Sequence, residues 1–220
     1  MFKSILKMAN QNSREYAIYQ EKKYFVKDGV LSIIRKEIKF IDEIEGLKKL
    51  TNLKVLNLSM NEITEGEGLD TLKNLKILDL TTNKISEIKG LDNLTNLHKL
   101  SLRKNQITEI EGLNNLKLLY SLDLGNNKIG EIKGLNHLKN LGVLDLSLNE
   151  IKEINGLDDL NQIYSLSLNG NQIQQIKNLK SLESLEELDL SHNQIFTIKG
   201  LETLKHININ LRFNPIQMKN

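Results

Sequence analysis

The chain has 220 residues and no cysteine, and its 30 basic and 28 acidic residues leave a net charge of only +2. The lack of cysteine excludes a disulfide framework and a thiolate metal site, and a balanced surface poor in arginine argues against nucleic acid, which favours clustered basic charge. No segment has the roughly 18–20 apolar residues that span a bilayer, and the N-terminal apolar run lacks a signal-peptide cleavage site. These features predict a cytoplasmic, intracellular protein with neither a nucleic-acid nor a membrane partner.

Residues 1–45 are predicted to form an N-terminal cap made of a helix and a hairpin. The i, i+3, i+4, i+7 spacing of an amphipathic helix is found at Phe2, Ile5, Leu6 and Ala9. Asp28 and Gly29 lie between two apolar runs, which is the strongest short signal for a hairpin. A cap is expected because a solenoid needs an atypical terminal unit. A helix that docks a partner is the alternative.

Residues 46–220 are predicted to be one array of repeats, because asparagine recurs every 22 residues. These asparagines are Asn61, Asn83, Asn105, Asn127, Asn149, Asn171 and Asn193. Leucines precede each of them, replaced once by Ile163, and isoleucines follow. A fixed period containing Leu-x-x-Leu-x-Leu-x-x-Asn-x-Ile predicts seven regular stacked turns, each with a short strand in one parallel sheet. The asparagine amides are expected to satisfy buried backbone groups that cost about 1–3 kcal/mol each when unpaired.

The two ends of the array are less regular. Residues 31–52 are predicted to be a degraded first turn, in which Lys36 and Lys39 replace a leucine and the asparagine. Residues 206–214 alternate and predict a shortened last strand, with Asn214 one residue early as the final asparagine.

Little of a closing turn follows this last strand. We therefore expect Ile209 and Leu211 at an exposed edge that favours association, so that the chain is a monomer or a weak dimer. A short tail folded over the edge is the alternative.

The repeat resembles the 22-residue class of leucine-rich repeats, which includes the leucine-rich regulatory subunit of protein phosphatase 1 and the bacterial internalins. The resemblance covers about residues 31 to 216. It implies an α/β solenoid: a right-handed coil with a curved parallel sheet on the concave face and short 3-10 or irregular segments on the convex face.

For function, the resemblance implies a non-enzymatic protein-protein interaction module or regulatory scaffold that binds a protein partner on its concave face. Phosphatase regulation is one version of this role. The alternatives are a structural protein that self-associates through its C-terminal edge and an internalin-like adhesin. The adhesin would require an export signal, which the N-terminal sequence does not display.

The polar column between the two strand leucines should line the concave face. It reads Asn57, Asp79, Ser101, Asp123, Asp145, Ser167, Asp189 and Asn210. Asp123 and Asp145 are adjacent, about 4.8 Å apart, and like charges that close disfavour each other. We expect a partner's lysine or arginine to relieve this repulsion.

A basic island of Lys99, Arg103 and Lys104 lies between Asp79 and Asp123. It is a candidate contact for the partner. The alternative is a set of solvent-exposed ion pairs, each worth about 0–1 kcal/mol.

Tyr120 and Tyr164 share one lateral column, two turns apart, with Gly142 between them. This spacing predicts two rings about 10 Å apart across a notch, and tyrosine is enriched at interface hot spots. Packing along neighbouring loops is the alternative. The predicted partner-binding residues are Lys99, Arg103, Tyr120, Asp123, Asp145 and Tyr164, with Phe196 and Phe213 as weaker candidates.

No catalytic, cofactor-binding or metal-binding residue is predicted. The histidines fall in unrelated columns without a nucleophile beside them, at His98, His137, His192 and His206. Asp123 and Asp145 lie on a shallow open face and offer too few ligands for a metal ion.

Overall fold

The computed structural model describes residues 15–201, 204 and 207–217. The helix predicted from Phe2 to Ala9 lies outside the described residues. Among those described, no helix is long and apolar enough to cross a membrane.

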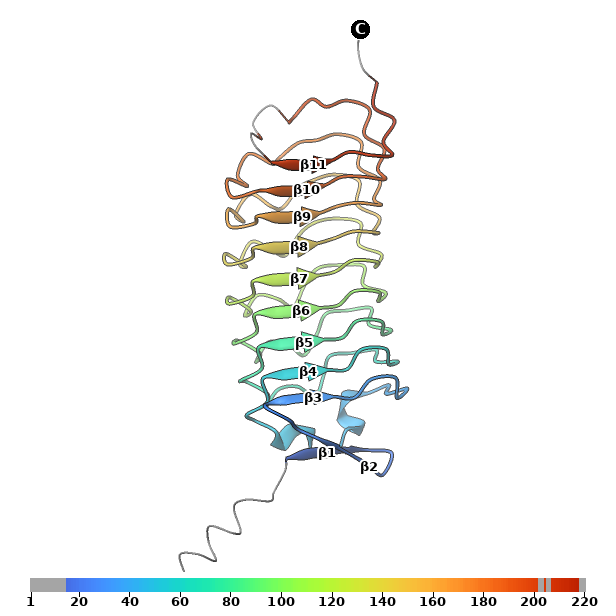
Figure 1. Cartoon of the computed structure of the whole chain (residues 1–220), viewed down its shortest axis with the longest axis vertical. Helices are drawn as coiled ribbons and strands as arrows, with labels where there is room; N and C mark the ends of the chain where they lie inside the picture. Colours follow the sequence, from blue (N-terminus) through green and yellow to red (C-terminus); the bar gives the residue numbers. More distant parts are fainter. Residues whose placement is uncertain (1–14, 202–203, 205–206, 218–220) are drawn as a thin grey trace, which may run out of the picture.

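One parallel sheet of nine strands runs through the molecule in chain order (Figure 1). Its strands are β3 (Val30–Ser32), β4 (Val55–Asn57), β5 (Ile77–Asp79), β6 (Lys99–Ser101), β7 (Ser121–Asp123), β8 (Val143–Asp145), β9 (Ser165–Ser167), β10 (Glu187–Asp189) and β11 (Asn208–Asn210). Each central leucine pairs with the central residue one turn away, as Leu122 pairs with Leu144 and Leu188 with Ile209. The predicted solenoid with a parallel sheet is confirmed.

The regularly spaced leucines that follow each glycine of the repeat are buried because the chain there turns every three residues. Leu94 N donates to Leu91 O and Leu97 N donates to Leu94 O, both at 2.9 Å, and the pattern recurs in each regular turn. Turns closed by i to i+3 bonds place residues i and i+3 on one face. Leu91, Leu94 and Leu97 therefore all point inward and are at most 1% exposed.

The asparagines form a continuous ladder through the array. Asn105 Nδ2 donates to Leu80 O at 3.0 Å and to Leu102 O at 2.9 Å, while its Oδ1 accepts from Ile85 N at 3.0 Å. Leu102 O accepts a second bond from Asn127 Nδ2 at 3.0 Å. Each asparagine thus satisfies buried backbone groups in its own turn and in the turn before.

The register predicted for the first turn is wrong by three residues. Leu31 pairs with Leu56, 25 positions later, whereas Leu56 pairs with Leu78, 22 positions later. Lys36, and not Lys39, therefore stands at the asparagine position, and its backbone N donates to Asn61 Oδ1 at 2.8 Å.

The extra residues of this turn lie in the segment that contains two short 3-10 helices. These are η1 (Ile41–Glu43) and η2 (Leu47–Lys49). An extra unit of three residues keeps the inward spacing of the apolar side chains, so the core accommodates it.

A hairpin covers the N-terminal end of the array. It consists of β1 (Tyr16–Tyr19) and β2 (Lys22–Phe25), and it buries Ala17 completely. Ile18 and Glu45 exchange two backbone hydrogen bonds of 2.9 Å, which attach the hairpin to the first turn. The predicted turn at Asp28 and Gly29 is present, but it leads from the hairpin into β3.

The C-terminal end has no such cover among the described residues. Asn214 forms the last rung, because its Oδ1 accepts from Ile195 N at 3.0 Å. The apolar residues of this last turn pack against the core but are only half-buried, unlike their equivalents one turn earlier. We call this set the open end: Leu201, Leu204, Ile207, Ile209, Leu211 and Ile216.

Candidate functional site

The polar column between the two strand leucines, from Asn57 to Asn210, has a structural role. Asp123 Oδ1 accepts from Gly125 N at 2.9 Å, and Asp145 Oδ1 accepts from Ser147 N at 2.8 Å. Asn57 makes the same bond to Ser59 N. A short side chain that bonds the backbone two residues later is an Asx turn. Aspartate and asparagine recur here because each shapes the exit of its strand.

Arg103 bridges the two neighbouring carboxylates. Its Nη1 lies 2.8 Å from Asp145 Oδ2 and 3.4 Å from Asp123 Oδ1, and it donates to Ser147 Oγ at 3.4 Å. The side chain can cross the intervening turn because Gly125 lies beneath it, where a Cβ would overlap the guanidinium. The chain thus supplies a positive charge of its own at the place where we expected a partner's lysine or arginine.

Burial nevertheless dominates at Asp123. Removal from water raises the pKa of this carboxyl, and the charge of Asp145 raises it further. The hydrogen bond from Gly125 N and the Arg103 guanidinium lower the pKa but do not cancel the effect. The ionised form of Asp123 is therefore held at a net cost.

The two tyrosines contact each other instead of flanking a notch. Their ring centroids lie 6.2 Å apart, and Tyr120 Oη donates to Tyr164 Oη at 3.1 Å. This hydrogen bond raises the pKa of Tyr164, and burial and the nearby carboxylates add to the rise. Gly142 allows the closure, because a Cβ there would lie 2.7 Å from Tyr120 Cε2 and 3.0 Å from Tyr164 Cε1. The predicted separation of about 10 Å is wrong, since both rings lean over the glycine.

Leu118, which precedes β7 beside Tyr120, was not among the residues predicted from the sequence. Each side chain is 43% exposed. Other turns have asparagine at the position of Leu118, and in three of them it donates to the turn before, as Asn96 Nδ2 does to Lys73 O at 2.9 Å. Leucine cannot make this bond. Aligning this outer column, which reads Asn74, Asn96, Leu118, Asn140 and Gln162, would have revealed the exception.

An open depression of about 590 Å³ extends from the tyrosines toward the C-terminal turns. Its lining consists of Tyr120, Asn140, Gln162, Tyr164, Ser184 and Glu186. Glu186 and Glu187 are exposed, and Glu187 Oε2 accepts from Ser165 Oγ at 3.1 Å. We call Leu118, Tyr120, Tyr164 and Glu186 the tyrosine rim. It joins an apolar aromatic surface to negative charge.

The remaining predicted residues lie apart from this rim. Lys99 is exposed and has no ion-pair partner among the described residues. Phe213 stacks on His192 with ring centroids 4.3 Å apart, at the open end of the array. Phe196 lies on the outer side of the coil. In the described part of the chain, no group of three metal-ligating side chains comes together.

Two family models match the chain. One, described as Leucine Rich repeats (2 copies), matches residues 51–93 and 95–137, and the other, Leucine Rich repeat, matches residues 181–205. No curated protein gave a match.

Solved structures of internalins from Listeria monocytogenes are similar to the chain. The internalin inlF is 35% identical with a TM-score of 0.78, over 86% of this chain and 56% of that chain. Internalin C2 (inlC2) is 30% identical with a TM-score of 0.75, over 83% of this chain and 80% of that chain. The chain thus spans little more than half of the inlF structure.

A third similar structure is the TLR13–ssRNA13 complex. The matched protein chain of that structure is 25% identical to this chain, with a TM-score of 0.71, over 91% of this chain and 29% of that chain. Because 434 solved chains match in total, the shared fold alone does not select a partner.

Proposed function

The chain belongs to the leucine-rich repeat family, and from this premise we propose that it is a protein-binding module that holds its partner at the tyrosine rim and the adjoining face of the sheet. The observation that carries the proposal is the Tyr120–Tyr164 pair beside Leu118. Tyr120 is exposed and Tyr164 is half-buried, in a column where other turns place lysine, histidine, glycine or glutamate. Binding without catalysis is the proposed role.

The chemistry of the rim fits a partner segment that presents an arginine or lysine next to an apolar residue. A cation over a tyrosine face gains about 0.5–2 kcal/mol, and Glu186 in the same depression supplies the opposite charge. Leu118 offers an apolar contact at the other end. Asp123 and Asp145 already hold Arg103, so we expect them to orient the neighbouring surface more than to attract a base.

The test is affinity purification from native cell extract, followed by calorimetry with each purified partner. Tyr120→Ala and Tyr164→Ala should each weaken binding by tenfold or more, because truncating a hot-spot residue costs about 2 kcal/mol or more. Phe40→Ala is the matched control, since Phe40 is an aromatic side chain, 55% exposed, at the far end of the array. Unchanged affinity in both tyrosine variants would show that the site lies elsewhere.

The same purification distinguishes the two finer roles suggested by the repeat class. A phosphatase catalytic subunit among the partners would support phosphatase regulation. A cell-surface receptor would support an internalin-like adhesin. A cytoplasmic location is also a proposal, and fractionation of the native cells tests it.

Self-association is the second candidate function. The observation that favours it is the open end, where β11 has, among the residues that the structure describes, a strand neighbour on one side only. An unpaired strand edge beside half-buried apolar residues is a site for pairing with another chain.

A further inference from the structure

Two adjacent columns of residues run past the tyrosine rim, and we call them together the rim strip. Backbone hydrogen bonds stack the first column, since Tyr120 N donates to His98 O and Gly142 N donates to Tyr120 O, both at 2.9 Å. This column reads Lys54, Lys76, His98, Tyr120, Gly142, Tyr164 and Glu186. The second column holds the first residue of each strand from β4 to β10 and reads Val55, Ile77, Lys99, Ser121, Val143, Ser165 and Glu187.

The charges of the rim strip are separated by sign. Its lysines precede the tyrosines and its glutamates follow them: the lysines are Lys54, Lys76 and Lys99, and the glutamates are Glu186 and Glu187. All of them are exposed, and among the described residues none has an ion-pair partner. The strip therefore has a positive half and a negative half, with the aromatic contact between them.

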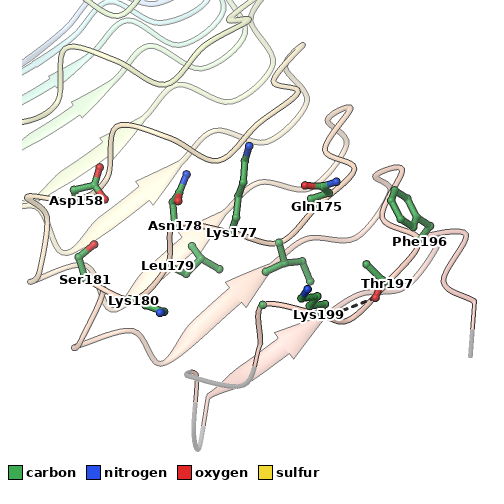
Figure 2. A pocket seen from close by; sticks show the side chains of 12 residues that line it. Asp158, Gln175, Lys177, Asn178, Leu179, Lys180, Ser181, Phe196, Thr197 and Lys199 are labelled. Atoms are coloured by element: carbon green, nitrogen blue, oxygen red, sulfur yellow. Dashed lines mark hydrogen bonds between the residues drawn. The ribbon is translucent and has the colours of Figure 1, made fainter. Parts of the chain in front are cut away.

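Charges on the outer side of the coil are mixed instead. A cavity of about 780 Å³ lies there, lined mainly by residues 175–181 and 196–200 (Figure 2). Lys177 of its lining pairs with Glu153 at 2.9 Å, and the acid Asp158 lies in the lining beside further lysines. The separation by sign is thus a property of the rim strip.

The polar column next to the strip also contains acids, but these bond to groups of the chain itself. Asp79 Oδ1 accepts from Thr81 N at 2.9 Å, and Asp123 and Asp145 pair with Arg103. Within the described part of the chain, none of them forms an ion pair with a lysine of the strip. The lysines are therefore available to a partner.

The two charged halves lie a defined distance apart. Lys99 in β6 and Glu187 in β10 are four strands apart, which corresponds to about 19 Å. An extended chain advances by about 3.3 Å per residue, so about six residues cover this distance. The depression beside the tyrosines is lined from two neighbouring positions of the turn, such as Gln162 and Tyr164. A strip this narrow suits an extended chain better than a helix, which is about 10–12 Å across.

We propose that the partner at the tyrosine rim is an extended segment whose charges are separated in the opposite sense to those of the strip. Its acidic end lies opposite the lysines, its apolar centre lies on the tyrosine rim, and its basic end lies opposite the glutamates. This inference rests on the proposed function, because it specifies the partner of the same site. Complementary charges at both ends select segments with this charge order and fix which end lies at which half.

The test uses two short peptides of identical composition, with both termini blocked. The ordered peptide is Glu-Glu-Ser-Leu-Tyr-Leu-Ser-Arg-Arg, and the scrambled peptide is Glu-Arg-Ser-Leu-Tyr-Leu-Ser-Glu-Arg. At low ionic strength the ordered peptide should bind the whole chain about fivefold more tightly than the scrambled one, as measured by NMR titration. High salt should reduce this difference, because it screens exposed charges.

A charge reversal on the protein tests the same order. Glu186→Lys combined with Glu187→Lys should weaken binding of the ordered peptide about fivefold, because the strip then carries charges of one sign. Glu111→Lys combined with Glu150→Lys is the matched control, which should leave binding unchanged. Both of these residues are exposed and lie outside the strip, and the control changes the net charge by the same amount.

Three results would overturn the proposed charge order: equal affinity for the two peptides, unchanged binding of the ordered peptide by the Glu186 and Glu187 double variant, or no binding of the ordered peptide at millimolar concentration. Tyr120→Ala separates such a failure from a failure of the proposed function. If Tyr120→Ala still weakens binding of a purified partner, the tyrosine rim remains the binding site and only the charge order is wrong.

Discussion

At the scale of single residues, one long side chain changes the electrostatics of the polar column. We call Arg103, Asp123, Asp145 and Ser147 the Arg103 cluster. Arg103 reaches carboxylates one and two turns away, at Asp123 and Asp145. Two acids that would repel each other become part of one ion-paired group. What the cluster contributes to stability depends on how much burial costs each carboxylate.

Asp123→Asn is predicted to stabilise the protein at neutral pH. Burial raises the pKa of Asp123 in the folded state above its ordinary value of 3.8, so ionisation costs stability as the pH rises through the folded pKa. Below 3.8 the carboxyl is protonated in both states and the cost vanishes. Thermal unfolding at pH 7 and at pH 3 should therefore show a higher Tm for the variant at pH 7 only.

In the Asp123→Asn variant, the amide oxygen can still accept the hydrogen bond from Gly125 N. Arg103 keeps its ion pair with Asp145. The matched control is Asp145→Asn, which removes the closer carboxylate of Arg103, at 2.8 Å, and should not stabilise. A lower Tm for Asp123→Asn at pH 7 would mean that its ion pair outweighs burial.

At the scale of the repeated turn, the asparagine ladder couples each turn to the one before. Asn127→Ala is predicted to cost roughly 2–4 kcal/mol, because it leaves Ile107 N without its bond of 3.0 Å and removes one of two bonds to each of Leu102 O and Leu124 O. The midpoint of urea unfolding followed by circular dichroism measures the loss.

Asn214→Ala is the comparison within the same ladder. Asn214 makes equivalent bonds to Ile195 N and Leu190 O, but it is only half-buried. Water can replace the amide there, so the expected loss is about 1 kcal/mol. Equal losses for Asn127→Ala and Asn214→Ala would contradict the assignment of the cost to buried backbone groups.

The 22-residue repeat explains how much of the fold could be predicted from the sequence. The strand register follows from Leu-x-Leu and asparagine, because these positions recur only once in 22 residues. The outer segment has an apolar residue every third position, so an insertion of three residues leaves the pattern intact. That ambiguity concealed the longer first turn, which the pairing of Leu31 with Leu56 reveals.

The candidate site was predictable in position and not in contacts. Its columns follow from the period, which assigned Tyr120, Gly142 and Tyr164 to one lateral column. The direction of long side chains depends on space two turns away, which Gly125 and Gly142 provide. The repeat does not specify this space, and so the Arg103 cluster and the closed tyrosine pair could not be predicted.

At the scale of the whole molecule, the two ends of the coil differ. The β1–β2 hairpin covers the end next to β3 and buries Ala17 and Tyr19 (Figure 1). At the other end, β11 and its neighbours expose part of their apolar side chains. A stack of turns is stabilised by nearest neighbours, and within the described residues the last turn has a neighbouring turn on one side only.

This asymmetry predicts weak self-association through the open end. Analytical ultracentrifugation should detect a dimer that increases with concentration, and Leu211→Lys should abolish it, because a lysine ammonium buried against a second copy would lose its hydration. Leu148→Lys is the matched control: Leu148 is 48% exposed but lies inside the array, so its dimer should persist. Far-UV circular dichroism must show both variants folded. A strict monomer for the unchanged chain at high concentration would remove self-association as a function and leave the tyrosine rim as the proposed binding surface.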